Sequence, residues 1–227
     1  EPWKNYFIST AAHNTLELGG QSQMLKARRF TWVYLIRSRT QHFQCGVNYD
    51  SFQGEHYAYR RLPSRATHRR SVLRLEDDSW LVVDDVLGSG SELVRLCWQL
   101  LDAPLEIDGN AVRLETEAGP VQLSFLASAA NFSLRVARGE SDPEVRGWNS
   151  LRYGQKQAEP TVLLEAKGAL PARFVTLVTL GTASQWRHCA SGSELLSGPL
   201  LEWELVESKR RLSVKIAPLA TGDAPVI

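Results

Sequence analysis

The sequence Leu-Glu-Trp-Glu-Leu-Val-Glu-Ser-Lys-Arg-Arg-Leu-Ser-Val-Lys-Ile, residues 201–216, alternates apolar and polar side chains on both sides of a charged centre. Positions 201, 203 and 205 are apolar and are separated by glutamates, and positions 212, 214 and 216 are apolar and are separated by serine and lysine. A period of two places the apolar side chains on one face of an extended strand. The stretch therefore predicts two half-buried antiparallel strands joined by a polar turn near residues 208–211.

The same alternation recurs along the chain. Apolar residues alternate at 112–114 and 121–125, around the turn sequences at 108–110 and 118–120, and strand-like runs at 72–75 and 80–83 flank another polar turn. Turn sequences about every ten residues are typical of sandwiches and barrels. We predict an all-β protein, a large antiparallel β-sandwich with few or no helices.

Three longer apolar runs refine this prediction. Residues 30–36 and 174–180 are apolar on both faces, which indicates strands buried between two layers. Residues 93–101 have a pattern that a helix could also produce, but their neighbours favour a strand.

The composition of the 227 residues, 43% hydrophobic and 22% charged, is that of an ordinary globular protein. No composition shift or long linker divides the chain, so we expect one β-sandwich domain over residues 1–227. Because the start, Glu1-Pro2-Trp3-Lys4, has no methionine, we expect a piece of a longer protein. The net charge of +1 gives no reason to expect nucleic-acid binding, and no apolar run is long enough to cross a membrane.

The cysteines and the paired carboxylates are given structural interpretations. Cys45, Cys97 and Cys189 lie far apart and form no C-x-x-C pair, so we interpret them as core thiols. The aspartate pairs at 77–78 and 84–85 are assigned to the ends of hairpins, where turn chemistry explains them.

His13 is the first candidate for chemistry. It follows four small residues, Ser-Thr-Ala-Ala at 9–12, and precedes Asn14. Small neighbours leave room for a ligand beside the ring, and imidazole is the side chain that exchanges protons near neutral pH. The alternative is a structural imidazole that is bonded to a loop carbonyl.

The second candidate is the segment 55–70, Glu-His-Tyr-Ala-Tyr-Arg-Arg-Leu-Pro-Ser-Arg-Ala-Thr-His-Arg-Arg, with two histidines, two tyrosines and five arginines. Arginine pairs with carboxylates and tyrosine offers a ring face, so we expect this segment to contact an acidic sugar. The expected contact residues are Tyr57, Tyr59, Arg60, Arg61, His68 and Arg69, with Arg65 and Arg70 adding positive charge. The alternative is a solvated loop followed by an edge strand with outward arginines.

The third candidate is the loop Gly-Trp-Asn-Ser-Leu-Arg-Tyr-Gly at 147–154. It has more aromatic and polar side chains than a plain connection needs, and Trp148 is its candidate substrate contact. In the alternative interpretation Trp148 plugs one end of the sandwich. His188 and Cys189 are interpreted as structural.

Three segments together resemble the heparinase II/III-like family. Residues 9–15 resemble its S-T-x-x-H-N-T motif. Residues 57–62 followed by 68–70 look like its G-Y-x-R-L … H-R-R segment, and residues 147–154 look like its G-W-x-S-x-x-Y-G segment. The three occur in the family's order across residues 9–154.

The resemblance implies a helical toroid before the β-sandwich, with the active site in the cleft between them. Members are polysaccharide lyases that act on uronic-acid polymers such as heparan sulfate or alginate. The family's catalytic tyrosine and its carboxylate-neutralising Asn or His belong to the toroid. The histidine of the S-T-x-x-H-N-T motif is carried over as catalytic His13, with Asn14 as a substrate contact, and a periplasmic or secreted location is implied.

Two positions depart from the family pattern. Many relatives have Arg before the Ser-Thr pair, where this chain has Ile8. Zinc-binding members use an H-x-H pair, and its second position is Thr15 here. We therefore predict no metal, and no cofactor is expected.

The expected function is that of the C-terminal β-sandwich domain of a heparinase II/III-like polysaccharide lyase, which contributes His13 to β-elimination on a uronic-acid polysaccharide. The expected partners are an acidic polysaccharide and the missing N-terminal helical domain, and not nucleic acid or a membrane. The isolated chain is expected to be inactive. The competing expectation is a non-catalytic carbohydrate-binding or scaffold sandwich, which would use a flat aromatic strip.

Overall fold

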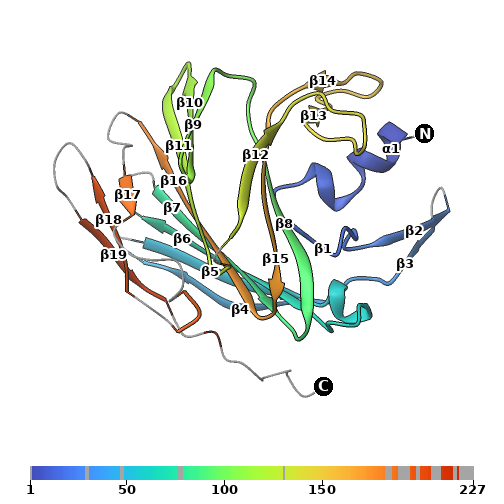
Figure 1. The fold of residues 1–227 in the computed structure, drawn as a ribbon, viewed down its shortest axis with the longest axis horizontal. Coiled ribbons are helices and arrows are strands. Elements are labelled where there is room, and N and C mark those ends of the chain that lie inside the picture. The colour runs from blue at the N-terminus through green and yellow to red at the C-terminus, as the bar shows by residue number, and fades with distance from the viewer. Residues whose placement is uncertain are drawn as a thin grey trace.

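The computed structural model describes residues 2–28, 31–46, 49–75, 79–129, 131–181, 186–188, 195–197, 200–205, 211–216 and 219. Strands hold more than half of these described residues, and helices hold few of them. Two antiparallel sheets, one of eight strands and one of four, form a β-sandwich (Figure 1). The all-β prediction is confirmed.

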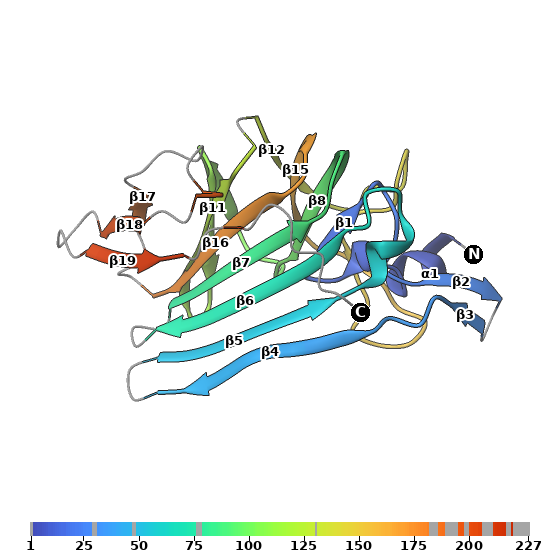
Figure 2. The same ribbon diagram turned by 90° about the horizontal axis from the view of Figure 1, so that it is seen from below.

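The larger sheet is antiparallel throughout. Its strands, in spatial order, are β4 (Ser38–Cys45), β5 (Tyr49–His56), β6 (Thr67–Leu75), β7 (Ser79–Leu87), β16 (Ala172–Leu180), β11 (Gly119–Ala127), β10 (Ala111–Thr116) and β9 (Leu105–Asp108). Figure 2 shows β4 to β7 side by side, with β4 at the outer edge. The pairings of β6 with β7 and of β10 with β9 and β11 confirm the hairpins expected around residues 76–79, 108–110 and 118–120.

The smaller sheet contains, in order, β1 (Leu16–Leu18), β8 (Ser91–Gln99), β15 (Thr161–Ala169) and β12 (Ser133–Ala137). The run at 93–101 is therefore a strand over most of its length, as expected. β1 has only three residues, but Leu16 and Leu18 are both fully buried. The segment that follows His13 is thus anchored in the core.

The main core lies between the two sheets. Leu96 and Leu164 of the smaller sheet and Phe125 and Phe174 of the larger one belong to the same buried cluster and are at most 1% exposed. Burying a side chain of this size contributes about 1.5–3 kcal/mol. This core makes the two sheets a stable support for the loops at their ends.

A third layer covers part of the opposite face of the larger sheet. β17 (Trp186–His188), β18 (Leu200–Leu205) and β19 (Arg211–Lys215) form a three-stranded sheet, and Val214 and Ile216 pack on a cluster that includes Val175 and Leu177 of β16. The antiparallel pairing of β18 with β19 confirms the C-terminal hairpin. β16 has apolar side chains on both faces because both of its faces are covered.

Short elements complete the described structure. They are the helix α1 (Pro2–Phe7), the 3-10 helices η1 (Thr10–Ala12) and η2 (Ala58–Arg61), and two hairpins, β2 (Leu25–Arg28) with β3 (Thr31–Val33) and β13 (Trp148–Asn149) with β14 (Gln157–Ala158). None of the helices in the described part of the chain has the length and apolar character needed to span a membrane.

The expectation that residues 30–36 are buried between layers is wrong for the described residues 31–36. They form β3 and the segment after it, where Tyr34 is 60% exposed and Leu35 is 81% exposed. The hairpin of β2 and β3 extends away from the two sheets (Figure 2), so neither of these sheets covers it as a second layer.

Two structural interpretations also need correction. Cys45 lies exposed at the end of the edge strand β4, whereas Cys97 is buried, and burial raises the pKa of its thiol to about 12. Asp84 and Asp85 are not at a hairpin end. They lie inside β7 and are 0% and 3% exposed, and each carboxylate is paired with an arginine, Arg70 and Arg173 respectively. Cys189 and the pair at 77–78 lie outside the described residues.

Candidate functional site

An open pocket of about 610 Å³ lies between the loop that carries His13, the β3 segment and the strands β4 to β6. His13 lines it from the loop, Trp32 from β3, and Phe52 from β5. His56 of β5 and the residues His68 and Arg70 of β6 also line it. With Arg39 and Glu55, which also line it, the pocket combines three imidazoles, two guanidinium groups, one carboxylate and aromatic surface.

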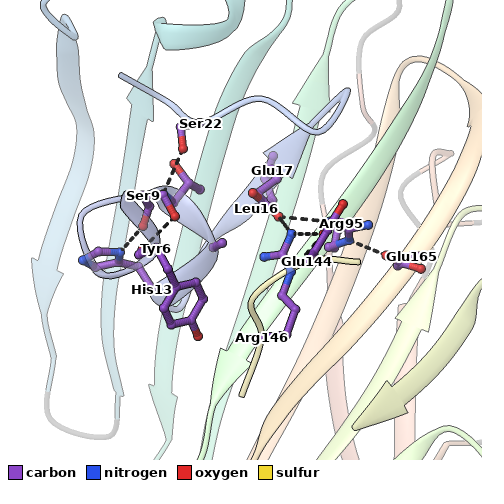
Figure 3. Close-up of polar contacts among 12 residues, drawn as sticks. Tyr6, Ser9, His13, Leu16, Glu17, Ser22, Arg95, Glu144, Arg146 and Glu165 are labelled. Carbon is purple, nitrogen blue, oxygen red and sulfur yellow. Dashed lines mark hydrogen bonds and ion pairs between the residues drawn. The ribbon is translucent and has the colours of Figure 1, made fainter. Parts of the chain in front are cut away.

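His13 is exposed at this pocket, at the C-terminal end of η1. Its Nδ1 lies 2.7 Å from the main-chain oxygen of Ser9 (Figure 3). A carbonyl oxygen can only accept a hydrogen bond, so Nδ1 carries the proton. In the neutral ring Nε2 is therefore the nitrogen with the lone pair, and it can take up a proton or, once protonated, donate one.

Hydrogen bonds from several elements hold the loop in place. The amide of Thr10 donates to Ser22 Oγ over 3.2 Å, and the amide of Gln23 donates to Thr10 Oγ1 over 2.8 Å. Asn14 uses its side-chain oxygen to accept a hydrogen bond of 2.6 Å from the amide of Gln99 in β8. Asn14 is therefore a loop anchor, and it does not line the pocket.

A cluster of five charged side chains anchors β1 behind the loop (Figure 3). Glu17 accepts from Arg146 over 2.8 Å and from Arg95 over 3.4 Å. Arg95 also pairs with Glu165 of β15 and, over 2.9 Å, with Glu144. The cluster ties β1 to β8, to β15 and to the segment before β13.

Beneath the pocket a line of hydrogen bonds ends on Asp84. His56 Nε2 lies 2.9 Å from His68 Nδ1, and His68 Nε2 lies 2.7 Å from Asp84 Oδ1. Burial of Asp84 would raise its pKa, but Arg70 and His68 outweigh that effect and lower the pKa to about 2. Burial, together with the neighbouring His68 ring and the positive charge of Arg70, lowers the pKa of His56 to about 3, so its ring is neutral.

Arg70 connects this line to the His13 loop. It donates to both oxygens of Asp84, from Nε over 2.7 Å and from Nη2 over 3.1 Å. Its Nη1 donates to the main-chain oxygen of Asn14. One guanidinium therefore bridges a buried carboxylate and the residue next to His13.

Two of the residues expected to contact substrate, Tyr59 and Arg61, have internal hydrogen-bond partners. Tyr59 is fully buried and its hydroxyl donates to Leu16 O over 2.8 Å, so it belongs to the core. Arg61 donates to the main-chain oxygens of Ala58, Ser22 and Gln23. Neither side chain lines the pocket.

The remaining residues of the 55–70 segment form a second group. Tyr57 and Arg69 both donate to Glu55, over 3.2 Å and 2.7 Å, and Arg60 lies over the Tyr57 ring, 4.1 Å from its centroid. Strand alternation places Arg69 on the face of β6 opposite to His68. The alternative of an edge strand is wrong, because β6 has neighbours on both sides.

Trp148 lies away from the pocket. Its ring contacts that of Trp3 edge to face, with 4.7 Å between centroids, and Lys156 Nζ lies 3.6 Å from both centroids. Its Nε1 donates to Glu140 O over 2.9 Å. A substrate contact by Trp148 stays a prediction. The predicted contacts of Asn14, Tyr57, Arg60, Arg61 and Arg69 also stay predictions.

Sequence reasoning missed His56, Asp84 and the aromatic wall of Trp32 and Phe52. His56 and His68 are register partners in β5 and β6, which brings their side chains to the same face. The register of that hairpin was the missing information, since the two histidines are twelve positions apart in sequence.

Thr15 stands where zinc-binding members of the family have the second histidine of their H-x-H pair, and its side chain does not suit a zinc ion. Thr15 Oγ1 accepts a hydrogen bond of 3.1 Å from Gln23 Nε2, and a hydroxyl is not among the usual zinc ligands. Among the described residues, no three His, Cys, Asp or Glu side chains are grouped as a metal site requires.

Known proteins share this fold. The heparan sulfate lyase HepC from Pedobacter heparinus superposes with a TM-score of 0.71 at 21% identity, covering 96% of this chain and 32% of that one. A heparinase III gene product gives a TM-score of 0.69 at 20% identity, with coverages of 94% and 32%. At these identities the likeness concerns the fold alone, and the chain spans about a third of the length of either structure.

The sequence comparison goes further than the fold. No curated protein matches the chain significantly. Residues 1–196, however, match the family described as Heparinase II/III-like, C-terminal, which covers most of the chain and confirms the resemblance seen in its motifs. With its sandwich fold and this match, the chain belongs to the heparinase II/III-like family, as a C-terminal domain.

Proposed function

We propose that this chain is the β-sandwich domain of a polysaccharide lyase, and that His13 transfers a proton during β-elimination on a uronic-acid polymer. The observation that carries the proposal is the state of the His13 ring. It is exposed at a pocket, its Nδ1 is fixed by Ser9 O, and its Nε2 is left as the reactive nitrogen.

β-Elimination has requirements that suit such a ring. The C5 proton of a uronic acid becomes acidic enough only when the neighbouring carboxylate is neutralised, and a base must then reach C5. The electron pair of the C5–H bond forms the C4–C5 double bond and expels the 4-linked oxygen, which must receive a proton. His13 Nε2 serves as the base at C5 or, protonated, as the acid at the leaving oxygen.

The rest of the machinery is proposed to lie elsewhere in a longer protein. A helical domain before residue 1 would supply the second proton-transfer group and the groups that neutralise the carboxylate. The pocket walls from Trp32 and Phe52 give a sugar ring apolar surface to rest on. Such a substrate is found outside the cytoplasm, and a periplasmic or secreted location is proposed with it.

His13→Ala in the full-length protein tests the proposal. With heparan sulfate and alginate as substrates, formation of the unsaturated product should fall by at least about a hundredfold, the contribution of one positioned acid or base. The free energy of unfolding should change by no more than about 1 kcal/mol, because one exposed hydrogen bond is lost.

His42→Ala is the matched control. His42 is also an exposed histidine with one hydrogen bond, to Ser51, and it does not line the pocket. Its loss should leave turnover unchanged. If His13→Ala retains full turnover, or loses activity only because it unfolds, the proton-transfer role is refuted.

One observation favours the second candidate, a non-catalytic carbohydrate-binding sandwich. Phe43 and Phe52 are cross-strand partners in β4 and β5, and they are 69% and 39% exposed. Such rings can stack on sugars without any proton transfer. In that case Phe43→Ala would abolish binding to oligosaccharides while His13→Ala would leave it intact.

A further inference from the structure

We propose that Asp84 is a positioning residue of this site: through Arg70 it holds the main chain beside His13, and through His68 it holds His56 in the pocket wall. The inference rests on the proposed role of His13. It assigns a function to a carboxylate that lies inside β7 and does not itself line the pocket.

The burial of Asp84 is the first argument. The residue is 0% exposed, and its partners His68 and Arg70 have side chains 3% and 23% exposed. Its Oδ1 accepts from both partners and its Oδ2 accepts from Arg70. An interior ion pair is weak evidence for a gain in stability over apolar residues, so a role in positioning the pocket accounts better for these contacts.

The direction of the hydrogen bonds is the second argument. An ionised carboxylate can only accept, so His68 donates from Nε2 and its Nδ1 is left to accept from His56 Nε2. His56 Nδ1 then accepts from the amide of Ala58 over 3.4 Å. One negative charge thereby fixes the tautomers of two rings that line the pocket.

The link to His13 is the third argument. The main-chain amide of Gln99 in β8 donates a hydrogen bond to the side-chain oxygen of Asn14. The side chain of Arg70 in β6 donates a hydrogen bond to the main-chain oxygen of Asn14. Arg70 can reach both Asp84 and Asn14 only because its planar guanidinium carries donors on several sides. Without Asp84 to orient its guanidinium, Arg70 would lose its hydrogen bond to Asn14 O, and the loop that carries His13 would be less firmly held.

The neighbouring residue Asp85 provides a matched control. It is 3% exposed and binds Arg173 with bonds of 2.6 Å and 3.0 Å, as Asp84 binds Arg70. It lies on the opposite face of β7 by strand alternation, and neither Asp85 nor Arg173 lines the pocket. The two aspartates thus share their strand, burial and type of partner, and differ in what they hold.

The experiment compares Asp84→Asn with Asp85→Asn in the full-length protein. The ring nitrogens of 15N-labelled histidines are followed by NMR, with signals assigned through His13→Gln and His68→Gln. Asp84→Asn should abolish the downfield Nε2–H signal of His68, shift the ring signals of His13, and lower kcat on heparan sulfate by about tenfold to a hundredfold with little change in KM. Asp85→Asn should leave the histidine signals and kcat unchanged.

Arg70→Lys covers the case in which Asp84→Asn does not fold. Lysine keeps the charge but cannot bond Asp84 and Asn14 together, so the His13 signals should shift while the His68 Nε2–H signal remains. Unchanged His13 signals in the folded variants, or the same shift in Asp85→Asn, would overturn the inference. If the wild type does not act on heparan sulfate, the proposed function fails there, and the NMR comparison still decides the role of Asp84.

Discussion

His13 and His56 line the same pocket, yet their surroundings give them different chemistry. His13 is exposed and has a main-chain oxygen as its partner. His56 is held neutral by burial, by the neighbouring His68 ring and by the positive charge of Arg70, which lower its pKa to about 3. The proposed proton transfer is therefore assigned to the exposed His13, and His56 is given a fixed hydrogen-bonding role.

The lowered pKa of His56 predicts how stability depends on pH. The unfolded chain takes up this proton near pH 6.5, but the folded chain takes it up only near pH 3, so acidification between these values favours unfolding. The free energy of unfolding should fall by up to about 1.4 kcal/mol per pH unit for this group. Asp84 adds a further loss as the pH falls from 3.8 towards about 2.

Urea unfolding of His56→Gln and of the wild type across this pH range measures the effect. The variant should show a shallower loss of stability below about pH 6.5. His42→Gln, at an exposed position on β4, should behave as the wild type. Identical slopes in His56→Gln and the wild type would contradict the assignment.

At the scale of elements, the turn before β13 depends on a glycine. Gly147 has a φ of +70°, and a Cβ built there would lie 2.5 Å from Ala137 O and from the Cα of Arg138. Gly154, at the other end of the same loop, has a φ of +77° but open space around it. The two glycines share a positive φ, but only at Gly147 do backbone atoms of another segment lie too close for a Cβ atom.

Gly147→Ala is therefore expected to cost much more stability than Gly154→Ala. The positive φ alone costs about 1–2 kcal/mol, which Gly154→Ala should show. Gly147→Ala should lose at least about 3 kcal/mol, because backbone atoms cannot yield as a flexible side chain can. Urea midpoints of both variants give the comparison, and equal losses would mean that the close approach relaxes freely.

Strands were predictable from the sequence where one of their faces is buried and the other is exposed, because apolar and polar residues then alternate. The hairpin of β10 and β11 has this local period, with Val112, Leu114 and Phe125 buried as expected. The apolar run around β3 was misread because the absence of a covering layer is not encoded locally. Likewise Asp84 looks like a turn residue until β6 places Arg70 opposite it.

In the candidate site, too, the residues of one contiguous segment were predictable, and the contacts that depend on strand pairing were not. His13 was identifiable because its motif is contiguous in the chain. His56, His68 and Asp84 meet through the register of three strands, and that register depends on long-range pairing. The arginines of residues 60–70 were visible as a charged segment, but their partners Glu55 and Asp84 were not.

For the whole molecule, the proposal that another domain completes the site has a direct test. The 227-residue chain alone should form no unsaturated uronate from heparan sulfate or alginate, because the proposed mechanism assigns only one of the two proton-transfer groups to it. Absorbance near 232 nm, a standard readout of that product, measures it, with the longer protein as the positive control. Turnover by the isolated chain would place both groups within these residues.

The charged cluster around Glu17 has a consequence for how such sequences diverge. Arg146, whose side chain is 5% exposed, pairs with the buried Glu17 and with Glu144, which is 52% exposed, so losing Glu17 leaves the arginine charge in the interior without a buried carboxylate partner. Breaking a buried pair in this way costs about 3–5 kcal/mol, whereas replacing all its members by apolar residues is often neutral. Substitutions here should therefore be inherited together, and homologues that lack Glu17 should also lack Arg146.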